Sequence, residues 1–375
     1  DYILQQLLAK PLRNKDTDIK MLLLMGLYQL QYMRVKSHAA VSETVTAANK
    51  KSWAKSLINA VLRQYIREQA ELEKNADKQQ TALLSHPQWI INKITNDWSE
   101  QAEKLLLENN QQPPMALRVN LTQSNQQAYI ELLLEHKIAA RAVSFCCSAI
   151  VLEQPVAVEK LPGFNQGMVS VQDTAAQLAA ELLDTQAGQR VLDLCAAPGG
   201  KTAAILERQA EAISMLAVDI DEARLTRVSD NLQRLKLDAK VLVGDAAKPD
   251  EWVQGQMFDR ILVDVPCSAL GVIRRHPDIK LLRRETDIDE LQAVQQQILS
   301  AAWELLLPGG ILLYATCSIL KQENEQQIET FLTKQADAEE LVIDAEWGEK
   351  RPFGRQLLTG DQGTDGFYYA KMTKR

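Results

Sequence analysis

The amino-acid sequence predicts an α/β protein whose main domain is a doubly wound parallel sheet, preceded by an all-α region and a small α+β connector. From Thr174 onward, short runs rich in Val, Ile and Leu alternate with helical patterns. Such alternation is typical of a mostly parallel sheet with helices on both faces. Before residue 80 the apolar residues follow helical spacing throughout, and the prolines at 113–114 interrupt the helical pattern.

We therefore predict three parts, residues 1–110, 111–170 and 171–375. Because Asp1 already lies within a helical pattern, we expect the first part to be N-terminally incomplete. Its expected helices lie at 21–32, 39–49, 52–74, 87–97 and 99–109, with a polar linker at 75–80. The expected connector elements are strands at 115–120, 140–145 and 149–153 and a helix at 125–136.

In the third part, strands and helices are expected to alternate. The strands are expected at 190–195, 213–218, 240–244, 259–264, 310–315, 341–344 and 366–372. The helices are expected at 174–184, 201–210, 221–235, 287–307 and 323–334.

Composition excludes several classes of protein. Of the 375 residues, 46% are hydrophobic and 24% are charged, which is ordinary for a globular chain. The five cysteines include no Cys-x-x-Cys pair, which argues against a disulfide framework or a zinc ribbon and fits a reducing cytoplasm. No apolar run reaches the ~18 residues that a membrane span needs. We expect a cytoplasmic monomer with no metal and no membrane partner.

Charge is unevenly distributed along the chain. The first 70 residues carry eleven basic and five acidic side chains, whereas the remaining 305 carry 31 and 44. This asymmetry predicts a basic accessory region attached to an acidic main domain.

The strongest local pattern is Val191-Leu-Asp-Leu-Cys-Ala-Ala-Pro-Gly-Gly-Lys-Thr202, an apolar strand followed by a glycine turn that opens a helix. The glycines let the backbone approach a ligand, and the helix N-terminus suits an anionic group. A tight structural turn would look the same. The spacing matches neither Gly-x-Gly-x-x-Gly nor a phosphate-binding loop.

Acidic residues end the next strands as well, at Asp219, Asp245 and Asp264. Each alone would be an ordinary helix cap or turn residue. Together they lie at the carboxyl ends of parallel strands, where open α/β sheets bind ligands. An acid twenty residues after Gly199 suits two ribose hydroxyls. The pattern predicts a site for a cofactor that contains a nucleoside.

Two cysteines are expected at the same edge, Cys267 in Asp264-Val-Pro-Cys-Ser268 and Cys317 in Ala315-Thr-Cys-Ser318. Ionised thiols are effective nucleophiles. Two thiols and a carboxylate at one pocket indicate covalent catalysis, for which hydride transfer has no use. A NAD-dependent dehydrogenase is therefore the weaker interpretation.

These segments closely resemble the RNA cytosine-5 methyltransferases that use S-adenosylmethionine, as do Arg274-Arg-His-Pro-Asp278 and Asp365-Gly-Phe-Tyr-Tyr-Ala-Lys371. The front, with His38-Ala-Ala-Val-Ser-Glu43 and Leu57-Ile-Asn-Ala-Val-Leu-Arg63, is similar to NusB-like RNA-binding domains. Joined in one chain, the halves resemble bacterial enzymes that methylate 16S ribosomal RNA. The resemblance implies a Rossmann-like methyltransferase domain.

The resemblance also implies roles for individual residues. Cys317 would be the nucleophile that bonds to C6 of the cytosine, Cys267 would assist product release, and Asp264 would lie between cofactor and base. Asp219 would bind the ribose and Asp245 would lie by the adenine. The methionine part would lie along Ala196, Ala197, Pro198, Gly199, Gly200, Lys201 and Thr202.

RNA contacts are expected from a basic cluster after the Pro-Cys motif, which comprises Arg274, Arg275, Lys280, Arg283 and Arg284. A solvated charged surface is the alternative interpretation of this cluster. For the whole chain, the alternative is a noncatalytic RNA-binding or ribosome assembly factor with a vestigial methyltransferase fold. The intact cysteines and Asp264 argue against that alternative.

Overall fold

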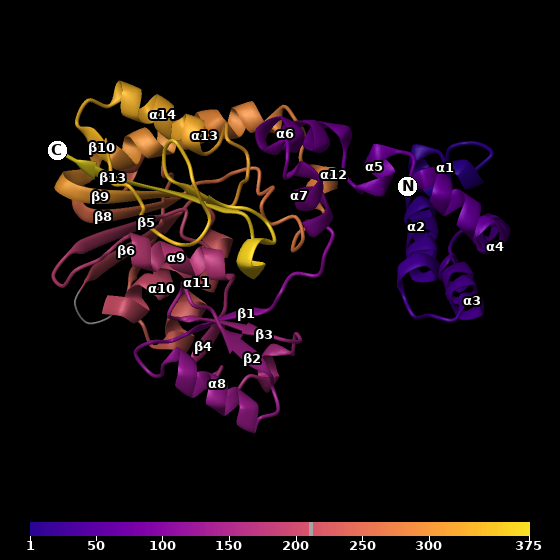
Figure 1. Ribbon diagram of the computed structural model, residues 1–375, viewed down its shortest axis with the longest axis horizontal. Coiled ribbons are helices and arrows are strands. Elements are labelled where there is room, and N and C mark those ends of the chain that lie inside the picture. The colour runs from indigo at the N-terminus through magenta and orange to yellow at the C-terminus, as the bar shows by residue number, and fades with distance from the viewer. Residues whose placement is uncertain (210–212) are drawn as a thin grey trace. The chain divides into compact units, whose positions relative to one another are not determined.

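The computed structural model describes residues 1–209 and 213–375 (Figure 1). The chain divides into two compact units, Asp1–Gln88 and Trp89–Arg375. Among the described residues, no helix is both long and apolar enough to cross a membrane. They also contain no group of three or more His, Cys, Asp or Glu side chains arranged to hold a metal ion.

The first unit is helical, as predicted. Its longest helix, α4, places Ile58, Leu62 and Tyr65 at helical spacing on one face, and all three are fully buried. They pack with Ile19 and Leu23 in a single hydrophobic cluster. The helices of this unit are α1 (Tyr2–Leu7), α2 (Thr17–Tyr32), α3 (Ser37–Ala47), α4 (Ser52–Ala76) and α5 (Gln80–Leu83).

Helices α6 (Gln88–Trp98) and α7 (Ala102–Glu108) follow the division at residue 88. The indole of Trp98 donates a hydrogen bond of 2.7 Å to the Ile319 carbonyl, deep in the second unit. The Lys321 amide donates to the Asp97 carboxylate at 3.0 Å. The predicted boundary at 110 thus differs from this division, because these partners lie more than 200 residues further along the chain.

The connector forms a four-stranded antiparallel sheet in the order β2-β3-β1-β4. Its helix α8 (Gln126–Glu135) begins where the Asn125 side chain accepts a hydrogen bond from the Ala128 amide at 2.9 Å. The α+β arrangement agrees with the sequence-based expectation. The strands are β1 (Ala116–Val119), β2 (Ala140–Ala142), β3 (Ala149–Leu152) and β4 (Val169–Val171).

The main sheet has the order β11-β12-β13-β9-β8-β5-β6-β7, and β10 also pairs with β13. Strands β5 to β9 run parallel to one another, whereas β13 is antiparallel to β9. The strands are β5 (Arg190–Leu194), β6 (Ser214–Asp219), β7 (Lys240–Val243), β8 (Phe258–Asp264), β9 (Leu306–Thr316), β10 (Ala338–Glu340), β11 (Glu349–Lys350), β12 (Arg355–Leu357) and β13 (Phe367–Lys374).

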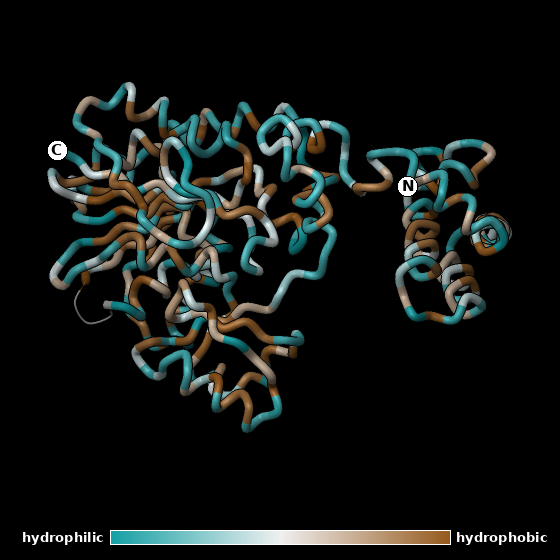
Figure 2. The backbone as a smooth tube through the Cα atoms, in the orientation of Figure 1, coloured by the Kyte–Doolittle hydropathy of each residue, from teal (hydrophilic) through white to brown (hydrophobic). Residues whose placement is uncertain are grey.

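Helices cover both faces of this sheet (Figure 1), with α9, α10 and α11 on one face and α13 and α14 on the other. The hydropathy colouring in Figure 2 shows mainly apolar segments in the central strands, as expected for strands buried on both faces. The helices are α9 (Thr174–Leu182), α10 (Gly200–Gln209), α11 (Glu222–Leu235), α12 (Ile279–Leu282), α13 (Asp287–Glu304) and α14 (Glu325–Lys334).

The predicted strand at 341–344 is wrong. Pairing with β13 ends after Glu340, and the Leu341 amide makes one last hydrogen bond to the Lys371 carbonyl at 2.8 Å. Ile343 is buried from a loop instead, so its apolar character reflects core packing rather than strand pairing. The last residue of the predicted helix 201–210 lies outside the described residues.

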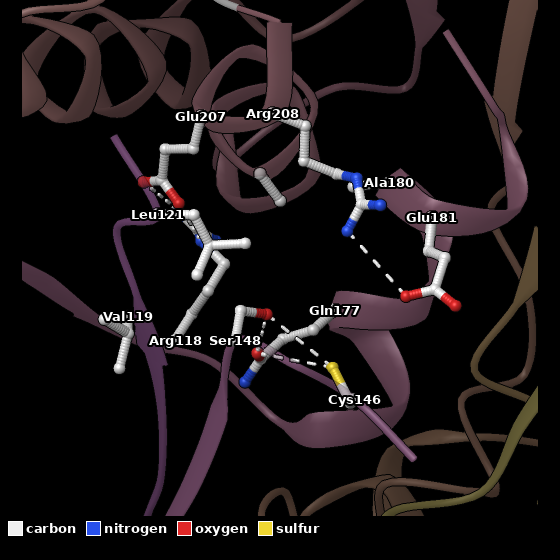
Figure 3. Close-up of a pocket in the computed structure, with 11 residues that line it drawn as sticks. Arg118, Val119, Leu121, Cys146, Ser148, Gln177, Ala180, Glu181, Glu207 and Arg208 are labelled. Atoms are coloured by element: carbon white, nitrogen blue, oxygen red, sulfur yellow. Dashed lines mark hydrogen bonds and ion pairs between the residues drawn. The ribbon is translucent and has the colours of Figure 1, made fainter. Parts of the chain in front are cut away.

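A buried ion pair joins the connector to helix α10 beside the main sheet (Figure 3). Arg118 on β1 donates to the Glu207 carboxylate on α10 through Nε and Nη2, at 2.7 and 2.9 Å. Both side chains are 3% exposed. A further Arg118 nitrogen donates to the Gly200 carbonyl at 2.7 Å, so the same arginine fixes the first residue of α10.

Replacing Glu207 with alanine is expected to lower the free energy of unfolding by about 3–5 kcal/mol, because it leaves the buried Arg118 charge unpaired. Urea unfolding followed by circular dichroism measures the change. Glu181→Ala is a matched control, since Glu181 is 50% exposed and lies 3.7 Å from Arg208. We expect the control to cost at most about 1 kcal/mol. Equal losses in the two variants would contradict the assignment of a buried structural pair.

Candidate active site

The five parallel strands bring the predicted acids and thiols to one edge of the sheet, where they surround a cavity of about 310 Å³. Asp219 ends β6 and Asp264 ends β8, while Asp245 follows β7 and Cys317 follows β9. The cavity is lined by Cys195, Ala197, Asp219, Ile220, Arg224, Gly244, Asp245, Ala246, Asp264, Val265, Pro266, Cys267, Val294, Ile298 and Cys317. Its volume falls within the usual range of ligand pockets.

Backbone amides orient the Asp219 carboxylate. One oxygen accepts from the Ala197 amide at 3.0 Å, and the other accepts from the Asp221 amide at 3.1 Å. The Arg224 guanidinium lies 3.8 Å from the same carboxylate and donates to the Ala197 carbonyl at 2.9 Å. Since each carboxylate oxygen keeps a further lone pair, Asp219 can accept two hydroxyl groups from a ligand.

The turn before α10 requires glycine. Gly199 has a φ of +91°, and a Cβ built there would lie 3.0 Å from a Val228 side-chain carbon and 3.1 Å from its Cα. Backbone conformation and crowding therefore both select glycine at this position.

Of the seven residues predicted along the methionine part of a cofactor, Ala197 lines the cavity. Thr202 is fully buried, and its hydroxyl donates to the Asp193 carboxylate at 2.6 Å. Ala196 is buried and its amide donates to the Val218 carbonyl, whereas the Pro198 carbonyl accepts from Asn231. Five of the predicted residues do not line the cavity and only shape the turn beside it, namely Ala196, Pro198, Gly199, Gly200 and Thr202.

Asp193 is fully buried beneath this turn, and burial raises the pKa of its carboxyl to about 7. An unfolded chain ionises the same group near pH 4, so between about pH 4 and 7 the folded state binds the extra proton. The contribution of Asp193 to stability is therefore present at low pH and is lost as the pH rises toward 7.

We expect Asp193→Asn to remove this dependence. The unfolding free energy of the parent minus that of the variant should fall from pH 5 to 7, with a slope of at most about 1.4 kcal/mol per pH unit. Urea titrations across that pH range measure the difference. A difference that rises with pH would contradict the assignment of a protonated buried carboxyl.

The two predicted thiols converge. The sulfur atoms of Cys267 and Cys317 lie 3.4 Å apart, although the residues are 50 positions apart in the chain. Both are free cysteines, and both line the cavity together with Asp264. The hydrogen bond to Cys317, together with burial and the nearby Glu323 charge, holds the pKa of Cys267 well above its ordinary value. Cys267 therefore rests as a thiol that can donate a proton toward Cys317.

Asp264 forms an ion pair that sequence alone did not indicate. Lys201 Nζ lies 2.6 Å from Asp264 Oδ2 and 5.0 Å from the centre of the Phe367 ring. Burial lowers the pKa of Lys201, but the charge of Asp264 and its hydrogen bond to Lys201, together with the nearby Cys317 and Asp193, outweigh burial and raise that pKa. Lys201, predicted as a cofactor contact, thus holds Asp264 in place at the cavity wall.

Arg274 and Arg275, which are predicted RNA contacts, form ion pairs within the second unit. Arg274 is buried, and its side chain is bonded to the Asp365 carboxylate at 2.6 Å. Arg275 is bonded to Asp365 and to Asp173. Because carboxylates that are distant in the chain already occupy these guanidinium groups, both arginines hold the fold together. Lys280 donates to the side-chain oxygen of Asn110 at 2.6 Å.

The other two predicted arginines lie differently. Arg283 donates through Nη2 to the Cys267 carbonyl at 3.3 Å, which places it beside the thiol loop. Arg284 is exposed, and its guanidinium has no hydrogen-bond or ion-pair partner within residues 1–209 and 213–375. Arg284 therefore has the strongest geometry for a phosphate contact among the five.

A doubly wound sheet with a carboxylate-lined cavity at the carboxyl ends of its parallel strands defines an α/β enzyme of the nucleotide-cofactor class. The sequence pattern of the 16S rRNA methyltransferase RsmB/F family matches residues 180–373. The ferredoxin-like domain of RsmF/B-like methyltransferases matches residues 86–159, and the NusB family matches residues 1–67. The chain belongs to the RsmB/F family of 16S rRNA methyltransferases.

Individual proteins agree with this membership. The chain is 49% identical over 376 residues to the ribosomal RNA small subunit methyltransferase B of Pseudomonas putida, covering 100% of this chain and 86% of that protein. The solved structure of PH0851 has a TM-score of 0.84 at 25% identity and covers 95% and 82% of the two chains. A methyltransferase homologue from Pyrococcus horikoshii has a TM-score of 0.69 at 27% identity and covers 79% and 97%. The predicted NusB-like and Rossmann-like methyltransferase domains are confirmed.

Proposed function

We propose that this rRNA methyltransferase transfers the methyl group of S-adenosylmethionine to C5 of a cytidine in 16S ribosomal RNA, through a covalent bond between Cys317 and C6 of the base. The observation that carries the proposal is the pair of sulfur atoms 3.4 Å apart in the cavity, beside Asp264. All five cysteines of the chain are free, which fits action in the reducing cytoplasm. We propose that the protein acts there as a monomer.

The residues of the cavity fit the proposed cofactor. The amide-oriented Asp219 carboxylate would accept the two ribose hydroxyls, and Asp245 would lie beside the adenine. The Asp245 carboxylate is held by the Ala247 amide at 2.9 Å. When bound, S-adenosylmethionine supplies an electrophilic methyl group on a sulfonium. All donors for that cofactor would come from the second unit.

The chain's own residues supply the activation of the base. Cytosine C5 is a poor nucleophile until a thiolate adds to C6, and the electron pair of the C5=C6 bond then becomes available at C5. Cys317 would form that bond. One oxygen of Asp264 is paired with Lys201, and its other oxygen can accept a hydrogen bond from the cytosine amino group and so orient the base.

Product release requires loss of the C5 proton and cleavage of the bond between sulfur and C6. The hydrogen bond with Cys317 is the largest cause of the raised pKa of Cys267. Once Cys317 is bonded to carbon its charge is gone, so Cys267 can release its own proton to solvent and, as a thiolate, take the C5 proton. The C5=C6 double bond then re-forms, and Cys317 leaves as a thiolate.

Methyl transfer tests the proposal directly. The purified chain is incubated with methyl-labelled S-adenosylmethionine and small-subunit rRNA, and the RNA is digested to nucleosides. We expect the label in 5-methylcytidine, with 23S rRNA as the control substrate. RNA binding without label transfer would favour the noncatalytic assembly factor, and label in another nucleoside would exclude C5 chemistry.

RNA affinity tests the remaining basic surface. Arg284→Ala is expected to weaken RNA binding and to reduce the slope of log Kd against log salt by about 1. The reason is that the loss of one phosphate contact lowers the number of counterions released on binding. Lys334→Ala, at the exposed end of α14, is the matched control. Filter binding over a range of salt concentrations measures both. An unchanged slope for Arg284→Ala would remove this residue from the RNA interface.

A further inference from the structure

We propose that Glu323 is the positioning residue that holds the two thiol loops in register, an inference that rests on the proposed function of Cys267 and Cys317. Glu323 is fully buried between β9 and α14. It does not line the cavity, and the mechanism above uses it for no chemical step. A fully buried carboxylate without a cation beside it needs a complete set of hydrogen-bond donors.

Those donors come from the two loops that carry the thiols. Ser268 directly follows Cys267, and Ser318 directly follows Cys317. Both serine hydroxyls lie 2.5 Å from the same oxygen, Glu323 Oε2, and 3.0 Å from each other. The other oxygen, Oε1, accepts from the Ser268 amide at 2.7 Å. A single carboxylate thereby joins the residues that follow the two thiols.

The direction of each hydrogen bond is set by the backbone. The Leu270 amide donates to Ser268 Oγ at 3.4 Å, and the Leu320 amide donates to Ser318 Oγ at 3.0 Å. Since a hydroxyl has one proton, each serine oxygen accepts a hydrogen bond from an amide and each hydroxyl donates its one hydrogen bond to Glu323. The two loops therefore approach the carboxylate in the same way, and their hydroxyl groups meet at one oxygen.

Glu323 itself is fixed from two further directions. Gln295 on α13 donates to Oε1 at 3.0 Å, and the Tyr314 hydroxyl donates to the Glu323 carbonyl at 2.8 Å. Gln295 also donates to the Pro266 carbonyl at 3.0 Å, one residue before Cys267. The network thus includes the backbone on both sides of the buried thiol.

The arrangement requires a carboxylate rather than an amide. Four donors converge on its two oxygens, and a glutamine would present an NH₂ group to one pair of them. Turned one way, the NH₂ group would face the Ser268 amide and the Gln295 NH₂ group; turned the other way, it would deprive the two serine protons of their acceptor. The serine loops would shift, and with them the sulfur atoms, since effective nucleophilic attack depends on alignment within fractions of an ångström.

The test compares Glu323→Gln with Glu329→Gln, which changes an exposed glutamate on α14 in the same way. We expect kcat for methyl transfer to fall about 100-fold in Glu323→Gln, while KM for S-adenosylmethionine changes less than about threefold. Dibromobimane, which forms one bond to each of two nearby sulfur atoms as two bromides leave, reports the thiol pair without any methyl transfer. Peptide mapping should show the Cys267–Cys317 cross-link at least about fivefold reduced in Glu323→Gln and unchanged in Glu329→Gln.

Several outcomes would overturn the proposal. An unchanged kcat would do so, and so would a lower kcat with an undiminished cross-link, because Glu323 would then act by another route. If Glu323→Gln does not fold, Ser318→Ala decides, since it removes one donor from the same oxygen and should reduce kcat and cross-link together. If the parent chain transfers no methyl group, the proposed function fails, while the cross-linking comparison still tests the positioning role.

Discussion

We expect Cys317→Ala to abolish methyl transfer, with a loss in rate of at least about 10⁴-fold, because it removes the proposed nucleophile of the covalent mechanism. Without a sulfur bond to C6, C5 of the cytosine has no electron pair to offer. The sulfur of Cys267 lies 3.4 Å from that of Cys317, and the assigned roles give it no bond to C6, so it does not replace the missing nucleophile. Initial rates with methyl-labelled S-adenosylmethionine and 16S rRNA measure the loss.

The control for this variant is Cys147→Ala, which removes an exposed thiol of the connector region. We expect the control to keep the parent rate, and we expect both variants to bind RNA as the parent does. A Cys317→Ala variant that retained a tenth of the parent rate would show that another group attacks the base.

Cys267→Ala is expected to have the second large effect, which is accumulation of a covalent RNA–protein complex that survives denaturant. In this variant Cys317 still forms its bond to C6, and the methyl group is still transferred. No Cys267 thiolate is then present to remove the C5 proton, so the bond between Cys317 and C6 cannot break at the normal rate. A band of reduced mobility in a denaturing gel, containing both labelled RNA and protein, measures the complex.

The double variant Cys267→Ala/Cys317→Ala is the control, and it should form no such complex. If Cys317→Ala accumulated the complex and Cys267→Ala did not, the two roles would be reversed. The present assignment rests on geometry and on the protonated state of Cys267, and this pair of variants separates the alternatives completely.

The edge of the sheet was predictable from the sequence because parallel strands carry their carboxyl ends to one place. Asp219, Asp245 and Asp264 each stand where an apolar run ends, and the structure collects all three around one cavity. The convergence of Cys267 and Cys317 follows from the same rule. The strand pattern in the sequence therefore indicates this group of residues, because it predicts that the carboxyl ends of the parallel strands lie at one edge of the sheet.

Side-chain partners were not predictable in the same way. Arg274 resembled a surface cation, but its partner Asp365 lies 91 residues further along the chain and is brought beside it by the antiparallel return of the last strand. Glu323 gave no sequence signal either, because a Glu at the first position of the predicted helix 323–334 has the pattern of an ordinary helix start. Such pairings depend on the packing of distant segments, which local patterns do not contain.

Element boundaries failed where packing overrode pattern. The apolar residues at 341–343 have the composition of a strand, yet the chain leaves the sheet at Leu341 and buries Ile343 from a loop. Helices α6 and α7 continue the helical pattern of the first 85 residues, yet Trp98 is anchored at Ile319. Hydrophobic patterning predicts that a segment is buried and does not identify the core in which it is buried.

The most direct test of the covalent mechanism is mass spectrometry of the chain trapped on RNA that contains 5-fluorocytidine. Fluorine at C5 cannot leave as a proton would, so the bond to C6 persists after methyl transfer. The mechanism predicts that proteolysis yields one nucleotide-bearing peptide and that fragmentation places the nucleotide, with its added methyl group, on Cys317. A nucleotide on Cys267, or no covalent complex from a chain that methylates unmodified RNA, would contradict it.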